Sequence, residues 1–186
     1  MKHSELGSTQ CPVAQSLDRV GEWWSIMIMR DALAGLTRFD EFQKSLGIAP
    51  NMLTRRLNDL VGAGLLDKQL YCQKPPRHEY ILTATGRDFY PVMAAFVAWG
   101  NRHFAGESRS TEIVDTTTGR PVRLGLVDLD TGEPIDRDRH PMAPGAGANE
   151  RIRYRFDYIK RKKQGQETDL RFEMPARSSQ NRPAEE

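Results

Sequence analysis

The chain of 186 residues is long enough for one compact domain with an appendage, and too short for two large hydrophobic cores. Its 38% hydrophobic and 28% charged residues are typical of a soluble globular protein, and no apolar run approaches the ~20 residues that span a bilayer. Two cysteines are too few for a disulfide framework and the start lacks signal-peptide features, so we expect a cytoplasmic protein with no membrane partner. The formal charge of +2 is only a weak indication of an acidic partner.

The first part of the chain is predicted to form helices. Pro12 suits the first turn of an amphipathic helix, and the apolar run 22–33 predicts a buried central helix. A short helix capped by Thr37 follows, and after a turn at Gly47 another helix is expected over 50–61. Two short helices joined by a tight, glycine-containing turn predict a helix-turn-helix.

A hairpin and a long helix are predicted next. The runs LLDKQLY and HEYIL predict two strands, with Pro75 and Pro76 at the tip of the connection. A helix capped by Thr85 is expected to continue to about Phe104, with Pro91 in its first turns or at a kink. These elements predict a mainly α fold with a small β-hairpin wing, which is a winged helix-turn-helix.

The composition changes after Gly106, where turn-forming residues become frequent. Alternating apolar residues at 124–129 and 152–158 predict strands in this part of the chain. The end of the chain has the composition of a largely disordered tail. The predicted organisation is therefore a flexible N-terminus (1–10), a winged helix-turn-helix domain (11–106), a small β-rich appendage (107–164) and a mostly disordered tail (165–186).

The helix predicted over 50–61 has a polar face opposite its leucines. Arginine can make two hydrogen bonds to guanine and asparagine two to adenine, so this face suits the major groove of DNA. A polar exposed face is common on any helix, and only the helix-turn-helix context favours this interpretation. Basic side chains of the hairpin are expected to reach phosphates. The predicted DNA contacts are Arg38, Asn51, Thr54, Arg55, Arg56, Asn58, Lys68, Lys74, Arg77 and His78.

Arg56 is the exception within this set. It points away from the polar face, so a phosphate or another side chain of the protein is its expected partner.

Several ordered motifs between Cys11 and Gly100 resemble the HxlR family of bacterial winged helix-turn-helix regulators. They are CPV, the tryptophan at 24, RFDEF, MLTRRLNDL, GLL, PPRHEY and LTATGRDFYPV. The resemblance implies a transcription regulator that binds a double-stranded DNA operator as a homodimer, through helices outside the winged core. The residues implied in dimerisation are Phe89, Val92, Met93, Phe96, Val97 and Trp99, which by spacing alone indicate an ordinary core.

Cys11 is a candidate redox or electrophile sensor. It precedes a predicted helix N-terminus, where amide groups and the helix dipole lower the pKa of a thiol. Some members of the family that the chain resembles sense oxidants through a cysteine at the matching CPV position. A half-buried packing cysteine fits the residues equally well. The expected effector is therefore an oxidant or a small molecule.

The appendage is similar in part to a zinc-ribbon-like extension, through TTGRPV, LVDLDTGEPIDRDRHP and PGAGA. Thr118 and Thr131 stand where knuckle cysteines would be, so we predict a remnant without a metal. The basic segment 151–163 is expected to form a strand that is either solvated or in contact with phosphates.

No catalytic constellation is found, because the four histidines are scattered and neither a phosphate-binding glycine loop nor a nucleophile elbow occurs. We therefore predict a non-enzyme without cofactor or metal, acting as a sequence-specific DNA-binding regulator. Two alternatives stay open: a ligand-responsive regulator without redox sensing, and a winged-helix adaptor that binds protein. The polar helix face disfavours the adaptor, which would expose apolar residues there.

Overall fold

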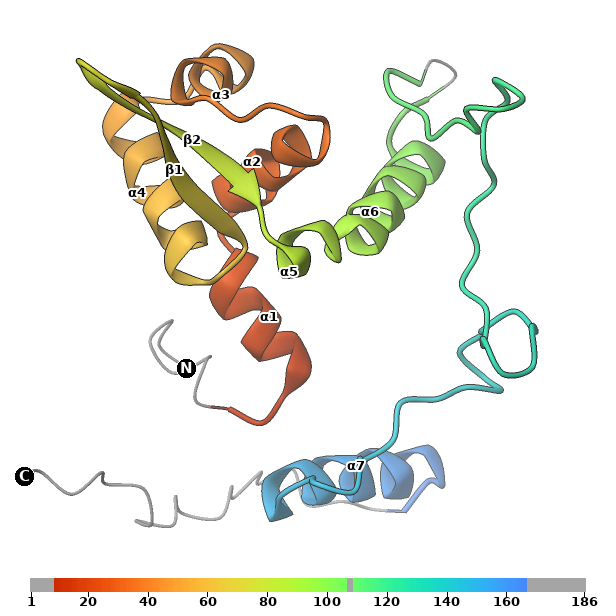
Figure 1. The fold of residues 1–186 in the computed structure, drawn as a ribbon. Helices are drawn as coiled ribbons and strands as arrows, with labels where there is room; N and C mark the ends of the chain where they lie inside the picture. Colours follow the sequence, from red (N-terminus) through yellow and green to blue (C-terminus); the bar gives the residue numbers. More distant parts are fainter. Residues whose placement is uncertain (1–8, 107–108, 167–186) are drawn as a thin grey trace, which may run out of the picture.

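The computed structural model describes residues 9–106 and 109–166 (Figure 1). Almost all of the predicted N-terminus and tail lies outside these residues. The mainly α fold with one two-stranded antiparallel hairpin confirms the expected fold class. The elements are α1 (Pro12–Val20), α2 (Trp23–Leu33), α3 (Phe39–Leu46), α4 (Pro50–Gly62), β1 (Leu66–Gln73), β2 (Pro76–Leu82), α5 (Ala84–Arg87), α6 (Tyr90–His103) and α7 (Glu150–Lys163).

The main hydrophobic core lies among α2, α3, α4 and the hairpin, which together form the winged core (Figure 1). Ile28 of α2 and Phe42 of α3 are fully buried there. On α4 the fully buried side chains are Leu53, Leu57 and Leu60, which recur at helical spacing. Each contributes about 1.5–3 kcal/mol by leaving water. The core thereby fixes which face of α4 is turned to solvent.

The start of α3 is held by a side chain inside its first turn. The Glu41 carboxylate accepts hydrogen bonds from the backbone N–H groups of Thr37 (2.9 Å) and Arg38 (2.8 Å), and these bonds lower the pKa of Glu41. The N-cap is Arg38, so the predicted Thr37 cap is wrong. The reason is a long-range contact, since the Thr37 carbonyl accepts a hydrogen bond from the backbone N–H of Tyr80 (2.7 Å).

The hairpin formed by β1 and β2 is the wing. Its register places Gln73 opposite Pro76, with an irregularity between Leu70 and Cys72. Pro75 lies in the connecting turn, and Pro76 begins β2, where the missing amide hydrogen costs least. The predicted strands and their turn are therefore confirmed.

The long helix expected after the wing is divided into α5 and α6. The cap of α5 is Thr83 rather than the predicted Thr85, because the Thr83 hydroxyl accepts a hydrogen bond from the backbone N–H of Gly86 (3.0 Å). Pro91 lies in the first turn of α6, where it removes no helical hydrogen bond. Of the two places predicted for Pro91, the first turn of a helix is the one found, and the chain breaks between α5 and α6 before it.

The break is fastened to the base of the wing. The Thr83 hydroxyl also donates a hydrogen bond to the carbonyl oxygen of Gly64 (2.7 Å). Gly86 is buried against Leu65, the residue that follows Gly64. A Cβ atom at position 86 would lie 2.1 Å from the carbonyl oxygen of Leu65. Only glycine permits this approach, so α5 cannot move away from the wing base without breaking a close fit.

The described part of the appendage is largely irregular before α7. Two isolated bridges, Val114–Pro121 and Val127–Pro134, close its turns. The carboxylate of Asp115 accepts hydrogen bonds from backbone N–H groups inside the first turn. The expected β-rich character is therefore limited to these bridges in the described residues.

The strand predicted over 152–158 is wrong, because the segment belongs to α7. Ile152 and Phe156 are four residues apart, a spacing that fits a helix as well as an alternation, and Ile159 continues the helical period only. Asn149 decides between them, because its side chain accepts a hydrogen bond from the backbone N–H of Ile152 (3.0 Å) as an N-cap. Across 9–106 and 109–166, no helix has the length and apolar character to cross a membrane.

Candidate nucleic-acid interface

The solvent-facing side of α4 carries Asn51, Thr54, Arg55 and Asn58, which we call the reading face. All four side chains are exposed, as the sequence predicts. Arg55 forms neither a hydrogen bond nor an ion pair within the described part of the chain, so its guanidinium group is free to bind a partner. The buried leucines on the other side hold the reading face in a fixed direction.

Two members of the reading face are already engaged with the backbone. The Thr54 hydroxyl donates a hydrogen bond to the carbonyl oxygen of Pro50 (2.8 Å). The Asn51 side-chain oxygen accepts one from the backbone N–H of Met52 (2.8 Å). Asn51 therefore offers its amide nitrogen as a donor, which suits a phosphate better than the two-bond recognition of adenine.

Arg56 is not part of the reading face. Its guanidinium group forms ion pairs with Glu22 (2.9 Å) and Asp59 (3.1 Å), and its side chain is only 11% exposed. The expected contact with another side chain of the protein is therefore the one found. These pairs join α4 to the residue before α2, so Arg56 holds α4 in place within the fold.

The wing presents basic side chains from the base of β1 to its turn. Lys68, Lys74 and Arg77 are exposed, whereas His78 is half-buried. Figure 1 shows the wing extending beyond α3, so the turn that carries Lys74 lies at the periphery of the molecule. Exposed cations at such a position are suited to phosphate contact, as predicted.

Arg38 lies between α3 and the wing. Its guanidinium carbon is 4.9 Å from the centroid of the Tyr71 ring, and its backbone forms a bridge with Glu79 of β2. The stacking restrains a long side chain that would otherwise be mobile. Sequence reasoning did not single out Tyr71, because only the folded wing brings it to Arg38.

Cys11 is the N-cap residue of α1 and is half-buried. The nearby backbone N–H of Ala14 lowers the pKa of its thiol, against the opposing effect of burial. The backbone of Val13 and the side chain of Arg155 lower that pKa further. The local helix terminus could be foreseen from the sequence, whereas the arginine from α7 could not.

The contact between the start of α7 and the residues before α1 includes a hydrogen bond. The backbone N–H of Asn149 donates to the side-chain oxygen of Gln10 (3.0 Å). A cavity at this junction is lined by Cys11, Ile152 and Phe156 among others. The appendage therefore reaches the candidate sensor.

Within residues 9–106 and 109–166, no cluster of three histidine, cysteine or acidic side chains is arranged to hold a metal ion.

The residues implied in dimerisation divide into two groups. Val92, Phe96 and Trp99 are 46%, 47% and 55% exposed on α6, and we call them the dimer face. Phe89 and Met93 pack against the core instead, so the structure places them in the interior of the winged domain. Val97 is half-buried and lines a groove between α6 and the appendage. Figure 1 shows α6 leading away from the winged core beyond α5.

Comparison with known proteins places these features in a family. The HxlR-like helix-turn-helix family matches residues 19–108. The HTH-type transcriptional regulator Rv3095 of Mycobacterium tuberculosis is 34% identical over 136 residues, which cover 73% of this chain and 86% of that protein.

Two solved structures extend the similarity beyond the winged core. PA1374 of Pseudomonas aeruginosa, described as a transcription factor, is 56% identical with a TM-score of 0.58, covering 78% of this chain and 99% of that one. PA1607, also described as a transcription factor, is 38% identical with a TM-score of 0.68, covering 76% of this chain and 99% of that one. The chain therefore belongs to the HxlR-like helix-turn-helix family of transcriptional regulators, which act by binding DNA and not by catalysis.

Proposed function

We propose that this protein is a homodimeric, sequence-specific regulator whose α4 enters the major groove of an operator. The observation that carries the proposal is the reading face, where polar side chains stand opposite fully buried leucines. A recognition helix in this family of folds lies in the major groove, and the wing beside it contacts the backbone. The exposed, unpaired Arg55 is the strongest candidate for a base contact.

The proposed roles differ along the interface. Arg55 and Asn58 bind base edges, because both are exposed and both have the geometry for paired hydrogen bonds. Asn51 and Thr54 bind phosphate or a neighbouring base edge. The proposed phosphate contacts of the wing and its neighbour are Arg38, Lys68, Lys74, Arg77 and His78. These contacts set affinity and register, while α4 sets specificity.

The dimer is supported by the dimer face. Val92, Phe96 and Trp99 are four and three residues apart, so they lie on one side of α6, and each is about half-exposed. The helix projects from the winged core (Figure 1). Apolar patches of this kind on soluble proteins mark interaction surfaces. Covering them with the same surface of a second copy gives a closed two-fold dimer. Such a dimer presents two α4 helices to successive major grooves, about 34–36 Å apart.

Cys11 is proposed as the sensor within this dimer. Because its pKa is lowered by the α1 amide groups and by Arg155, a larger fraction of the thiol is ionised near neutral pH. The thiolate sulfur attacks one oxygen of a hydroperoxide, the O–O bond breaks, and the sulfur becomes a sulfenic acid. The other oxygen leaves as an alkoxide or hydroxide and takes a proton from water. The oxidised sulfur no longer provides the negative charge that Arg155 contacts.

The pH dependence of Cys11 reactivity checks its part of the proposal. In a chain with Cys72→Ser, we expect the rate of alkylation by iodoacetamide to rise with pH around a midpoint below the ordinary pKa of a cysteine. Arg155→Gln is expected to move that midpoint upward, because it removes a favourable charge. Arg151→Gln, an equal charge change on the same helix, is the matched control. A midpoint at or above the ordinary value would refute thiolate activation.

The function as a whole is tested by binding the purified protein to DNA from upstream of its own gene across a salt series. We expect specific binding, with an association constant whose logarithm falls linearly with the logarithm of the salt concentration. Mild oxidation is expected to abolish specific binding in the wild type and to spare Cys11→Ser. If specific binding is unaffected by oxidation, the redox role is contradicted and a ligand-controlled regulator is supported. Binding without sequence preference would contradict the proposed regulator itself.

A further inference from the structure

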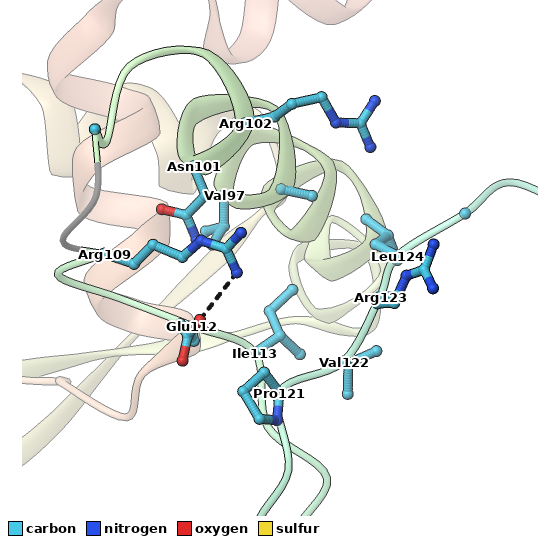
Figure 2. Close-up of a pocket in the computed structure, with 13 residues that line it drawn as sticks. Val97, Asn101, Arg102, Arg109, Glu112, Ile113, Pro121, Val122, Arg123 and Leu124 are labelled. Carbon is cyan, nitrogen blue, oxygen red and sulfur yellow. Dashed lines mark hydrogen bonds and ion pairs between the residues drawn. The ribbon is translucent and has the colours of Figure 1, made fainter.

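A groove of about 810 Å³ lies between α6 and residues 109–125 of the appendage (Figure 2). Apolar side chains line both of its walls. Val97 belongs to α6, whereas Ile113, Val122 and Leu124 belong to the appendage. Small-molecule sites typically have volumes of about 300–1,000 Å³ and mostly apolar walls, so the groove has the size of a ligand site.

The charged residues of the groove are predominantly positive. Arg109 is paired with Glu112 at 3.1 Å, as the dashed line in Figure 2 shows. Arg102 of α6 and Arg123 of the appendage also line the groove, and neither has a hydrogen bond or an ion pair with any other residue that the structure describes. Arg102 and Arg123 are both exposed, one on each wall, and give the outer edge of the groove an excess of positive charge (Figure 2).

We propose that this groove binds a small organic anion, a carboxylate carried on an apolar ring or chain. The apolar walls would bury the ring or chain. Arg102 and Arg123 would bind the carboxylate, because guanidinium groups match its geometry with paired, charge-assisted hydrogen bonds. A neutral molecule of the same shape would form hydrogen bonds without charge assistance, so the groove discriminates by charge.

The position of the groove would couple ligand binding to the dimer face and thereby to DNA binding. At about 100° per residue along a helix, Val97 and Asn101 lie on the side of α6 opposite Phe96 and Trp99 of the dimer face. The Asn101 side chain donates a hydrogen bond to the carbonyl oxygen of Thr111 (2.8 Å), which ties α6 to the appendage. One helix thus separates the groove from the dimer face. This consequence rests on the proposed dimeric regulator, whereas binding in the groove does not.

Isothermal titration calorimetry of the full chain without DNA tests the groove. The probes are 2-naphthoate and its neutral analogue 2-naphthamide. We expect 2-naphthoate to bind with one site per chain and 2-naphthamide to bind at least about tenfold more weakly, because it lacks the charge that strengthens the hydrogen bonds. Because no DNA is present, a failure to bind 2-naphthoate can be distinguished from a failure to bind the operator.

Matched variants assign the binding to the two arginines. The double variant Arg102→Gln, Arg123→Gln is expected to weaken 2-naphthoate binding at least about tenfold. Arg120→Gln is the control, since Arg120 is exposed in the same part of the appendage and does not line the groove. An unchanged circular dichroism melting curve shows that the variants fold. Equal affinity for both probes, or 2-naphthoate affinity that the double variant retains, would overturn the proposal.

Discussion

Phe96→Asp is expected to convert the proposed dimer into a monomer. Phe96 is 47% exposed in the single chain, so an aspartate at this position is solvated and the fold is retained. In a dimer that covers the dimer face, the same carboxylate would lie in an apolar interface without a partner. Burial of an unpaired charge costs several kcal/mol, which is enough to separate the subunits at micromolar concentration.

Light scattering or sedimentation measures this change directly. Leu129→Asp is the matched control, because Leu129 is 92% exposed in the appendage and lies outside the dimer face. We expect the Phe96→Asp monomer to lose about a hundredfold or more in affinity for a two-half-site operator, since the second half-site no longer binds within the same complex. A Phe96→Asp protein that remains dimeric would remove this face of α6 from the interface.

Arg55→Ala is expected to weaken specific DNA binding by about 1–3 kcal/mol, the cost of losing one paired base contact. Arg55 is exposed and unpaired among the described residues, so stability should change by no more than about 0.5 kcal/mol. Competition titrations against operator variants measure the effect. The loss should be largest for the operator that carries the contacted base and small for unrelated DNA.

Lys74→Ala provides the comparison for Arg55→Ala. Lys74 lies at the turn of the wing, and as a phosphate contact its removal should weaken binding to all sequences alike. The salt slope should then decrease by about 1. If Arg55→Ala instead behaves in the same uniform way, Arg55 binds a phosphate and another residue reads the operator.

Local patterns were sufficient to predict the winged core. The leucines of α4 recur at helical spacing, and Pro12 and Pro50 each begin a helix where the sequence places them. Helix caps were predicted less well. At α5 the reason is that Thr83 and Thr85, two residues apart, offer the same local signal. Thr83 caps α5 since it alone also reaches the Gly64 carbonyl at the wing base, which is a tertiary contact.

The appendage shows where periodicity becomes ambiguous. In RIRYRFDYI, apolar residues at every second position also include positions four residues apart, so the same letters fit a strand and a helix. The Asn149 cap and the helix-forming arginines and lysines favour α7. A cap placed before an alternating segment deserves more weight than the alternation itself.

Within the candidate site, the exposed residues of α4 could be predicted, whereas the contacts between elements could not. Arg56 binds Glu22, Arg38 stacks on Tyr71, and a residue of α7 reaches Cys11. Each of these pairs is separated by more than thirty residues in the chain. Spacing within one segment carries no information about such partners.

The close fit of Gly86 against Leu65 has a mechanical consequence. Because α5 is fastened to the base of the wing, a rotation of α5 moves the wing with it as a lever. The eight residues of β1 form its long arm. At ~3.3 Å per residue, a rotation of roughly 5° at the base displaces the wing turn by roughly 2 Å. In the proposed complex, a displacement of that size would break a hydrogen bond between the wing and a phosphate.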